Sequence, residues 1–181
     1  MSFLINGAVG LNVTVTEQAD GSLRFDLANQ GELAADLRGL FFDLNDASLL
    51  STLSVVGADV TRTAAGDDRV VNLGNGVTMA GAGSFDFGVA FGTAGIGKDD
   101  IHATSFTLKS SVGALELDDL FGCDFGVRFT SVGDPDGARG DSLKLVGEAP
   151  STPPPVDVPP PVIDLPPLFP PIGEPGGEVL M

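Results

Sequence analysis

The fold is decided first by the stretch LNVTVTEQADGSLRFDL, residues 11–27. Apolar residues occupy every second position from residue 11 to 15 and again from 23 to 27, with Asp20-Gly21 between the two runs. Alternation with a period of two is typical of half-buried strands, and an Asp-Gly pair is a common hairpin turn. We therefore predict an antiparallel hairpin here.

Short strand-like segments separated by Gly- and Asp-rich turns continue through the chain as far as residue 146. Nowhere does a long segment show the apolar periodicity of a helix, so we predict an all-β fold, a β-sandwich or jelly roll of about eight or nine strands. Short helical turns are expected at residues 46–50 and 117–121, each opening with a capping Asp. The further strands are expected at residues 37–44, 53–60, 69–73, 84–91, 104–109, 125–130 and 142–146.

Two similar strings, residues 86–91 and 124–129, differ only where Ala90 is replaced by Arg128. We predict that they form two similar strands, paired or facing one another. Their glycines fall on the outward face, where a strand needs no side chain if another backbone lies close. The large residues of each strand are expected to share the core-facing side: Phe85, Phe87, Val89 and Phe91 in one, and Phe125, Val127 and Phe129 in the other.

The C-terminal part has a different composition, because twelve of the thirteen prolines fall between Pro150 and Pro175. Such a segment favours polyproline II, which has three residues per turn. Reading every third residue from Val156 gives an unbroken apolar stripe on a rod of roughly 60 Å between Pro153 and Ile172. A solvated spacer needs no such stripe, so we predict an assembly interface at Val156, Val162, Leu165, Leu168, Phe169 and Ile172.

These patterns divide the chain into an N-terminal extension at residues 1–10, a sandwich domain at residues 11–147 and a Pro-rich acidic tail at residues 148–181. The formal net charge is −16, and no basic residue follows Lys144. Such a surface disfavours nucleic acid and anionic membranes as partners. We also expect no membrane span, because no stretch approaches the ~18 apolar residues that one needs.

An acidic loop at residues 133–142 is a candidate calcium site, with ligands Asp134, Asp136 and Asp141 around a turn-forming glycine. The loop is no EF-hand, because Leu145 stands where the bidentate Glu would be. The alternative is an ordinary solvated turn, and the sequence leaves both interpretations open.

Catalytic constellations are poorly supported, and we expect no enzymatic activity. The chain has one His and one Cys, His102 and Cys123, so neither a Ser-His-Asp nor a Cys-His set stands out. Cys123 follows a strand-like hydrophobic stretch and is expected to be a small buried side chain. The absence of Trp and Tyr also argues against sugar stacking.

Residues 40–46, 56–61, 89–101 and 124–133 resemble a β-rich module of acidic, Gly/Asp-rich exported bacterial proteins. Many of those proteins are calcium-dependent, RTX-associated adhesins, and many leave through a type I exporter that reads an uncleaved C-terminal signal. The resemblance implies an extracellular location. The chain lacks the Gly-Gly-x-Gly-x-Asp nonapeptides of that group, so no binding residues are transferred from it.

Taken together, these features predict a secreted structural protein that assembles with other copies of itself into a filament, layer or matrix. Either the tail or the segment before Leu11 would reach the neighbour. Two alternatives stay open at this point. One is a calcium-dependent adhesin or glycan-binding module, and the other is a protein that decorates a capsid or particle.

Overall fold

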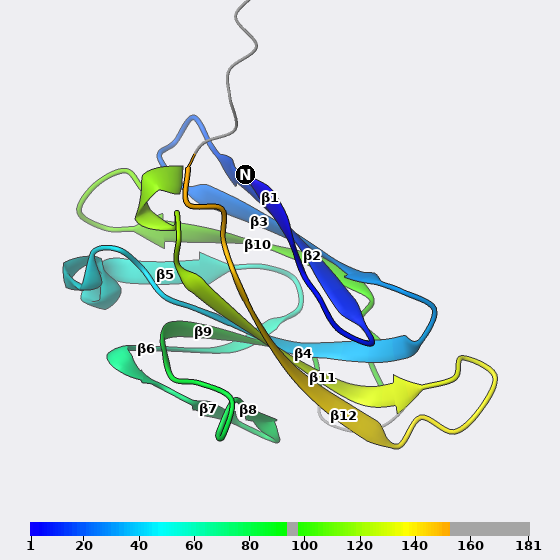
Figure 1. The fold of residues 1–181 in the computed structure, drawn as a ribbon. Coiled ribbons are helices and arrows are strands. Elements are labelled where there is room, and N and C mark those ends of the chain that lie inside the picture. The colour runs from blue at the N-terminus through cyan, green and yellow to red at the C-terminus, as the bar shows by residue number, and fades with distance from the viewer. Residues whose placement is uncertain (94–97, 153–181) are drawn as a thin grey trace, which may run out of the picture.

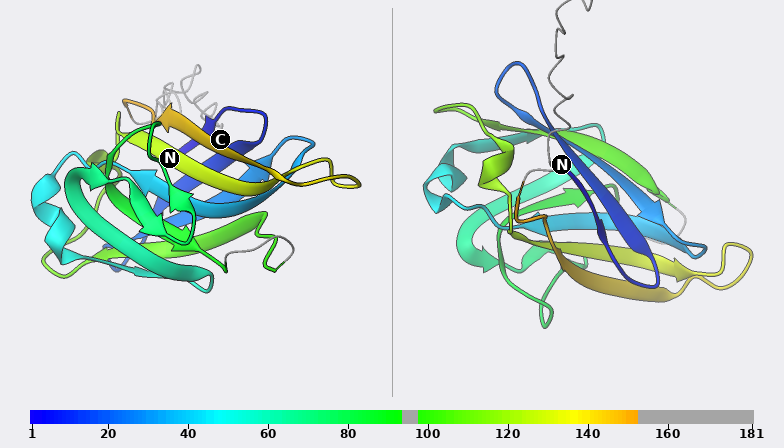
Figure 2. Two further views of the ribbon diagram at one scale, coloured as in Figure 1. Left: turned by 90° about the horizontal axis from the view of Figure 1, so that it is seen from below. Right: turned by 45° about the horizontal axis from the view of Figure 1, so that its top comes forward.

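The computed structural model describes residues 1–93 and 98–152, which form a β-sandwich of two five-stranded sheets (Figure 1). Neighbouring strands pair antiparallel in both sheets, and Figure 2 shows the two layers from other directions. Sheet A contains, in spatial order, β1 (Ser2–Ile5), β2 (Gly10–Glu17), β3 (Leu23–Gln30), β10 (Ala103–Ser110) and β5 (Leu53–Val56). Sheet B contains β12 (Asp141–Glu148), β11 (Asp124–Gly133), β4 (Ala34–Phe42), β9 (Phe85–Phe91) and β6 (Val60–Val70).

The sandwich prediction is confirmed, and so is the hairpin at residues 11–27. β2 and β3 pair antiparallel with Val15 opposite Phe25, and the inward side chains of both strands are buried. The described residues contain twelve strands, more than the eight or nine expected. The excess comes from β1, from β8 (Val77–Thr78) and from β6, most of which lies between the strands expected at residues 53–60 and 69–73. β8 forms a small separate hairpin with β7 (Asn72–Gly74).

The expected N-terminal extension is wrong, because residues 1–10 belong to the sandwich. β1 pairs antiparallel with β2, the Met1 ammonium donates to the carbonyl of Val15 at 2.8 Å, and both Ile5 and Val9 are fully buried. Asn6 and Gly7 lie in the turn between the two paired strands. This segment is therefore already engaged within its own chain.

The core between the sheets is built around a stack of phenylalanine rings. Phe25 and Phe106 of sheet A stack with centroids 4.6 Å apart, and Phe42 of sheet B lies 5.4 Å from Phe25. Phe42 in turn contacts Phe125 at 5.6 Å. Offset aromatic pairs of this kind contribute beyond their buried area, so the stack joins the two sheets.

The two similar strings form β9 and β11, which lie in the same sheet on either side of β4 rather than pairing or facing each other. Phe87, Val89 and Phe91 point into the main core as expected. Phe85 does not, because it belongs to a second buried cluster on the outer face of sheet B. The β7–β8 hairpin covers this second cluster, which contains Phe41, Val70, Leu73, Val77, Met79, Phe85 and Ala90.

Three glycines on adjacent strands make room for the hairpin. A Cβ added to Gly39, Gly88 or Gly126 would lie 2.5 to 3.1 Å from side chains of the second cluster. The outward position of Gly88 and Gly126 is therefore confirmed, although they face side chains and not a neighbouring backbone.

The two short helical turns are present as 3-10 helices. Asp46 caps the first, η1 (Ala47–Thr52), by accepting a hydrogen bond from the Ser48 amide at 2.9 Å. The second, η2 (Leu117–Asp119), begins after Glu116 and not after an Asp. The Asp119 carboxylate accepts a hydrogen bond from the Glu116 amide at 2.9 Å. Cys123 is buried, as the sequence predicted.

Replacing Gly126 by Ala tests this packing. The added methyl would lie 2.5 Å from Cζ of Phe85 and 2.8 Å from Cε of Met79, so we expect the free energy of unfolding to fall by about 1–3 kcal/mol. Gly113→Ala is the control, because its Cβ would meet nothing within 4 Å. Urea unfolding of both variants measures the difference. Equal stability of the two variants would show that Phe85 does not pack closely against Gly126.

Candidate functional site

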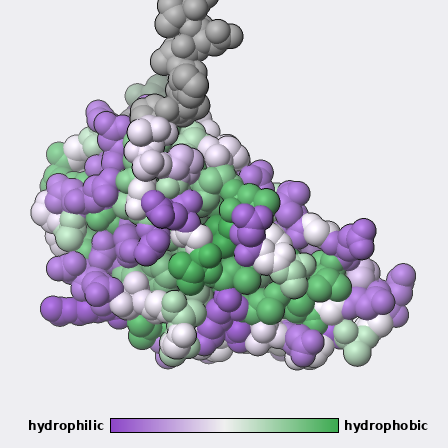
Figure 3. All heavy atoms as spheres, viewed as in Figure 1, coloured by the Kyte–Doolittle hydropathy of each residue, from purple (hydrophilic) through white to green (hydrophobic). Residues whose placement is uncertain are grey.

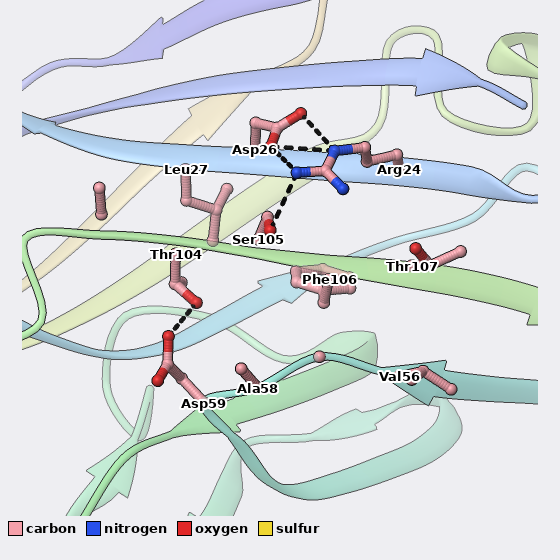
Figure 4. A pocket seen from close by; sticks show the side chains of 12 residues that line it. Arg24, Asp26, Leu27, Val56, Ala58, Asp59, Thr104, Ser105, Phe106 and Thr107 are labelled. Carbon is pink, nitrogen blue, oxygen red and sulfur yellow. Dashed lines mark hydrogen bonds and ion pairs between the residues drawn. The ribbon is translucent and has the colours of Figure 1, made fainter.

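The outer face of sheet A has a shallow hollow, because β5 ends at Val56 while its neighbour β10 continues (Figure 4). Arg24 and Asp26 of β3, Ser105 of β10 and the exposed Val56 line this hollow of about 560 Å³. Figure 4 shows the polar groups turned toward one another.

Charges in this hollow are already paired. The Arg24 guanidinium donates to the Asp26 carboxylate at 2.8 Å and to Oγ of Ser105 at 3.1 Å. The Thr104 hydroxyl donates to Asp59 at 2.6 Å. Because these groups satisfy one another, the hollow offers few free donors or acceptors to a charged ligand.

A second candidate region is a group of carboxylates near the ends of β4, β6, β9 and β11. Asp43 Oδ1 accepts from the amide of Asp86 at 2.9 Å. The buried Asp86 carboxylate accepts from the amides of Leu44 at 3.1 Å and Asp68 at 2.7 Å. Asp124 lies at the start of β11 beside them, since the Asp43 amide donates to its carbonyl at 3.0 Å. The carboxylates therefore tie three strands together through backbone amides.

Burial raises the pKa of Asp43 to about 6, and the charges of Asp86, Asp124 and Asp68 act in the same direction. The pKa of the nearby Cys123 thiol is raised to about 11, again mainly by burial and then by these carboxylates. Cys123 is therefore a protonated, buried thiol at neutral pH, which does not suit a nucleophile.

The third region is a pocket of about 270 Å³ on the outer face of sheet B, beside the β7–β8 hairpin. We call it the hairpin pocket. Arg38 of β4 and Arg62 of β6 line it, and the described residues of its lining include no carboxylate. Arg38 is only 3 % exposed and donates to the carbonyl of Thr93 at 2.6 Å, whereas Arg62 is exposed and donates to the carbonyl of Leu73 at 3.1 Å. Arg38 is paired with the buried Asp36 at 3.9 Å, so Arg62 is the lining guanidinium for which the described residues supply no ion pair. A guanidinium of this kind suits an anionic group.

The turn of the hairpin gives this pocket its wall. Gly74, Asn75 and Gly76 all have positive φ, at 83°, 50° and 79°. A side chain at Gly74 would lie 2.7 Å from Nη1 of Arg62, so glycine both allows the turn and leaves room for the guanidinium.

The predicted calcium ligands lie in the exposed β11–β12 loop. Asp134 Oδ1 accepts from the Asp136 amide at 3.0 Å within its own turn, and Asp141 begins β12. Within residues 1–93 and 98–152, no three His, Cys, Asp or Glu side chains form a group that could hold a metal ion. The structure thus does not gather Asp134, Asp136 and Asp141 into such a group.

The predicted assembly residues all lie outside the described part of the chain: Val156, Val162, Leu165, Leu168, Phe169 and Ile172. The sequence analysis missed the hairpin pocket. Its two arginines are 24 positions apart and stand in no recognisable motif. Only the strand order places them on one face.

In the described part of the chain, neither short helix approaches the length or apolar character that crossing a membrane requires. No protein-family model matches the chain, and no curated protein matches it.

Two solved structures are similar in outline. The GAE domain of GGA2p from Saccharomyces cerevisiae shares 6% identity at a TM-score of 0.34, over 82% of this chain and 94% of that one. The GAE domain of yeast GGA1 shares 10% identity at a TM-score of 0.29, over 81% and 95%. The sandwich class itself rests on the two sheets of this chain, and no function follows from this likeness.

The raised pKa of Asp43 predicts the pH dependence of stability. A carboxyl whose pKa is higher in the folded state binds its proton more tightly when folded, so its contribution to stability is full below pH 4 and is lost as the pH rises through 6. We expect Asp43→Asn to flatten this part of the stability curve, because Oδ1 can still accept from Asp86. Thermal melts between pH 4 and 7 measure it, with exposed Asp67→Asn as the control. An unchanged slope in Asp43→Asn would contradict the assignment.

Proposed function

We propose that the chain is an extracellular structural module that joins copies of itself into a filament, layer or matrix through its Pro-rich tail. The observation that carries this proposal is where the tail begins. The described chain ends at Thr152, in an apolar pocket of about 310 Å³ that Met1, Phe121 and Pro150 also line. A tail with an apolar stripe thus starts from an apolar end of the sandwich.

The neighbouring edge strands add to this apolar surface. β1 and β12 are edges of their sheets, and they carry Leu4 and Val146, each 45 % exposed, as well as the half-buried Leu143 and Leu145. Figure 3 shows hydrophobic surface across the middle of the face on which β1 and β12 lie in front. Exposed apolar edges are typical places of protein association.

Electron microscopy of the full chain tests the role of the tail. We expect Val162→Asn combined with Leu168→Asn to abolish assembly, because both exchanges interrupt the apolar stripe. Val158→Asn combined with Val179→Asn is the matched control, since these two valines lie off the stripe, and it should assemble as the unchanged chain does. Fibres from the stripe variant would show that the stripe is not the connector. A monomeric unchanged chain at every concentration would refute assembly altogether.

A calcium-dependent adhesin is the second candidate, favoured by the three carboxylates on the short β11–β12 connection. Binding there would require rearrangement, because Asp134 already accepts from the amide of its own turn. We therefore expect calcium to leave the melting temperature unchanged. A rise with calcium concentration, absent in Asp134→Asn with Asp136→Asn, would instead favour the adhesin, since a bound ion stabilises the folded state by mass action.

A further inference from the structure

Basic side chains in this acidic protein gather on one row of sheet B. In the strand register, Lys144 of β12 stands opposite Arg128 of β11, Arg128 opposite Gly39 of β4, Gly39 opposite Ala90 of β9, and Ala90 opposite Arg62 of β6. We call Lys144, Arg128 and Arg62 the basic row. The row crosses all five strands, with Gly39 and Ala90 between Arg128 and Arg62. Arg38 lies next to the row, because it directly precedes Gly39 on β4.

This row differs from three basic side chains elsewhere in the fold in what it contacts. Arg24, Lys109 and Arg139 each bind a carboxylate at 2.8 or 2.9 Å. The three cations of the basic row instead donate to main-chain carbonyls of the hairpin segment, at Leu73, Gly76 and Ala80. No ion pair is found for them within the described residues. Arg128 and Lys144 stand directly opposite one another, a pairing of like charges that destabilises a sheet.

The hairpin pocket lies at one end of this row, where Arg62 meets Arg38. A guanidinium has five N–H donors, and the described contacts of Arg38 are one hydrogen bond to Thr93 and an ion pair with Asp36 at 3.9 Å. Leu73 and Val77 add apolar lining to the same pocket. Its ligand should therefore be a carboxylate flanked by apolar side chains.

We propose that the hairpin pocket binds the acidic Pro-rich tail of a second copy, through Asp157 or Asp164. This inference rests on the proposed function and names its receiving site. The two carboxylates lie within the apolar stretch of the tail, and no basic residue follows Lys144 to neutralise them. The net charge of −16 repels polyanions such as nucleic acid. A polyanion also has no apolar stripe that could contact Leu73 and Val77 in the pocket.

The donor is a second copy for a geometric reason. The described chain ends at Thr152 beside the N-terminus, at the top of Figure 1, whereas the β7–β8 hairpin lies at the bottom. The next three residues are prolines, which favour an extended chain over an immediate return. A tail that leaves one surface and enters a different surface of the next copy makes a heterologous contact, and repeated heterologous contacts build open filaments or layers.

Two full-length variants test the site in combination. Arg62→Gln disables the pocket of an otherwise unchanged chain, and Asp157→Asn with Asp164→Asn disables the tail. Sedimentation velocity at low salt should show self-association weakened at least about tenfold in each, as expected for the loss of a charged hydrogen bond. Arg69→Gln, an exposed exchange on the same strand, and Glu174→Gln with Glu178→Gln are the matched controls and should associate normally.

Mixing the two disabled variants gives the sharpest result. The intact tail of the first fits the intact pocket of the second, so we expect heterodimers and no larger species. A mixture that stays monomeric would overturn the proposal, because it would mean that each tail fills its own pocket or none. Normal association of Arg62→Gln would overturn it too.

A peptide separates this inference from the proposed function. A fluorescent peptide of residues 153–172 is titrated into the tail-disabled full chain, whose own tail cannot compete, and its anisotropy is measured. We expect binding that weakens about tenfold when Arg62→Gln is added, and that weakens further at high salt. If the peptide binds to a chain that never assembles, the proposed filament is refuted, but the pocket remains supported as the binding site of the tail. Absence of binding would refute the pocket even if the chain assembles.

Discussion

The structure depends on one constraint, which is that β4 and β9 carry large apolar side chains on both faces. Every residue of β9 is buried, and so is every residue of β4 after Ala34. Phe42 and Phe87 need a cover on one side, and Phe41 and Phe85 need one on the other. Burying a phenylalanine contributes roughly 1.5–3 kcal/mol, so leaving either face in water would cost much of the stability of the domain.

Sheet A covers the inner face, and the short β7–β8 hairpin covers the outer one. The hairpin is small and rich in glycine, so its backbone carbonyls come close to the sheet. Basic side chains at the margin of the second cluster satisfy those carbonyls, as Arg128 does for Gly76. Covering the outer face thus gathers positive charge on a protein whose remaining surface is acidic, and the hairpin pocket results from it.

The carboxylates of sheet B differ from its basic side chains in their hydrogen-bond partners, which are backbone amides. Asp43 and Asp86 lie where strands end, and they accept hydrogen bonds from the backbone amides of Asp86 and Leu44, respectively. Their burial raises the proton affinity of Asp43 but also fixes the ends of three strands. The acidic group is therefore explained by its role in the fold, whereas the basic row has contacts that leave its charge unbalanced.

Local pattern was sufficient for most of the fold. Alternation at residues 11–27 predicted β2 and β3, and Asp46 was recognisable as a cap, because each of these depends on neighbours along the chain. The tail was expected to begin at residue 148, but β12 includes Glu148 and the core includes Ala149. The strand register and the strand order could not be recognised from the sequence. Nothing near Phe85 shows that it turns away from Phe87, and nothing near Arg62 shows that it shares a row with Arg128. Those relations join residues far apart in sequence, and only the tertiary structure decides them, since it alone determines which faces must be covered and by what.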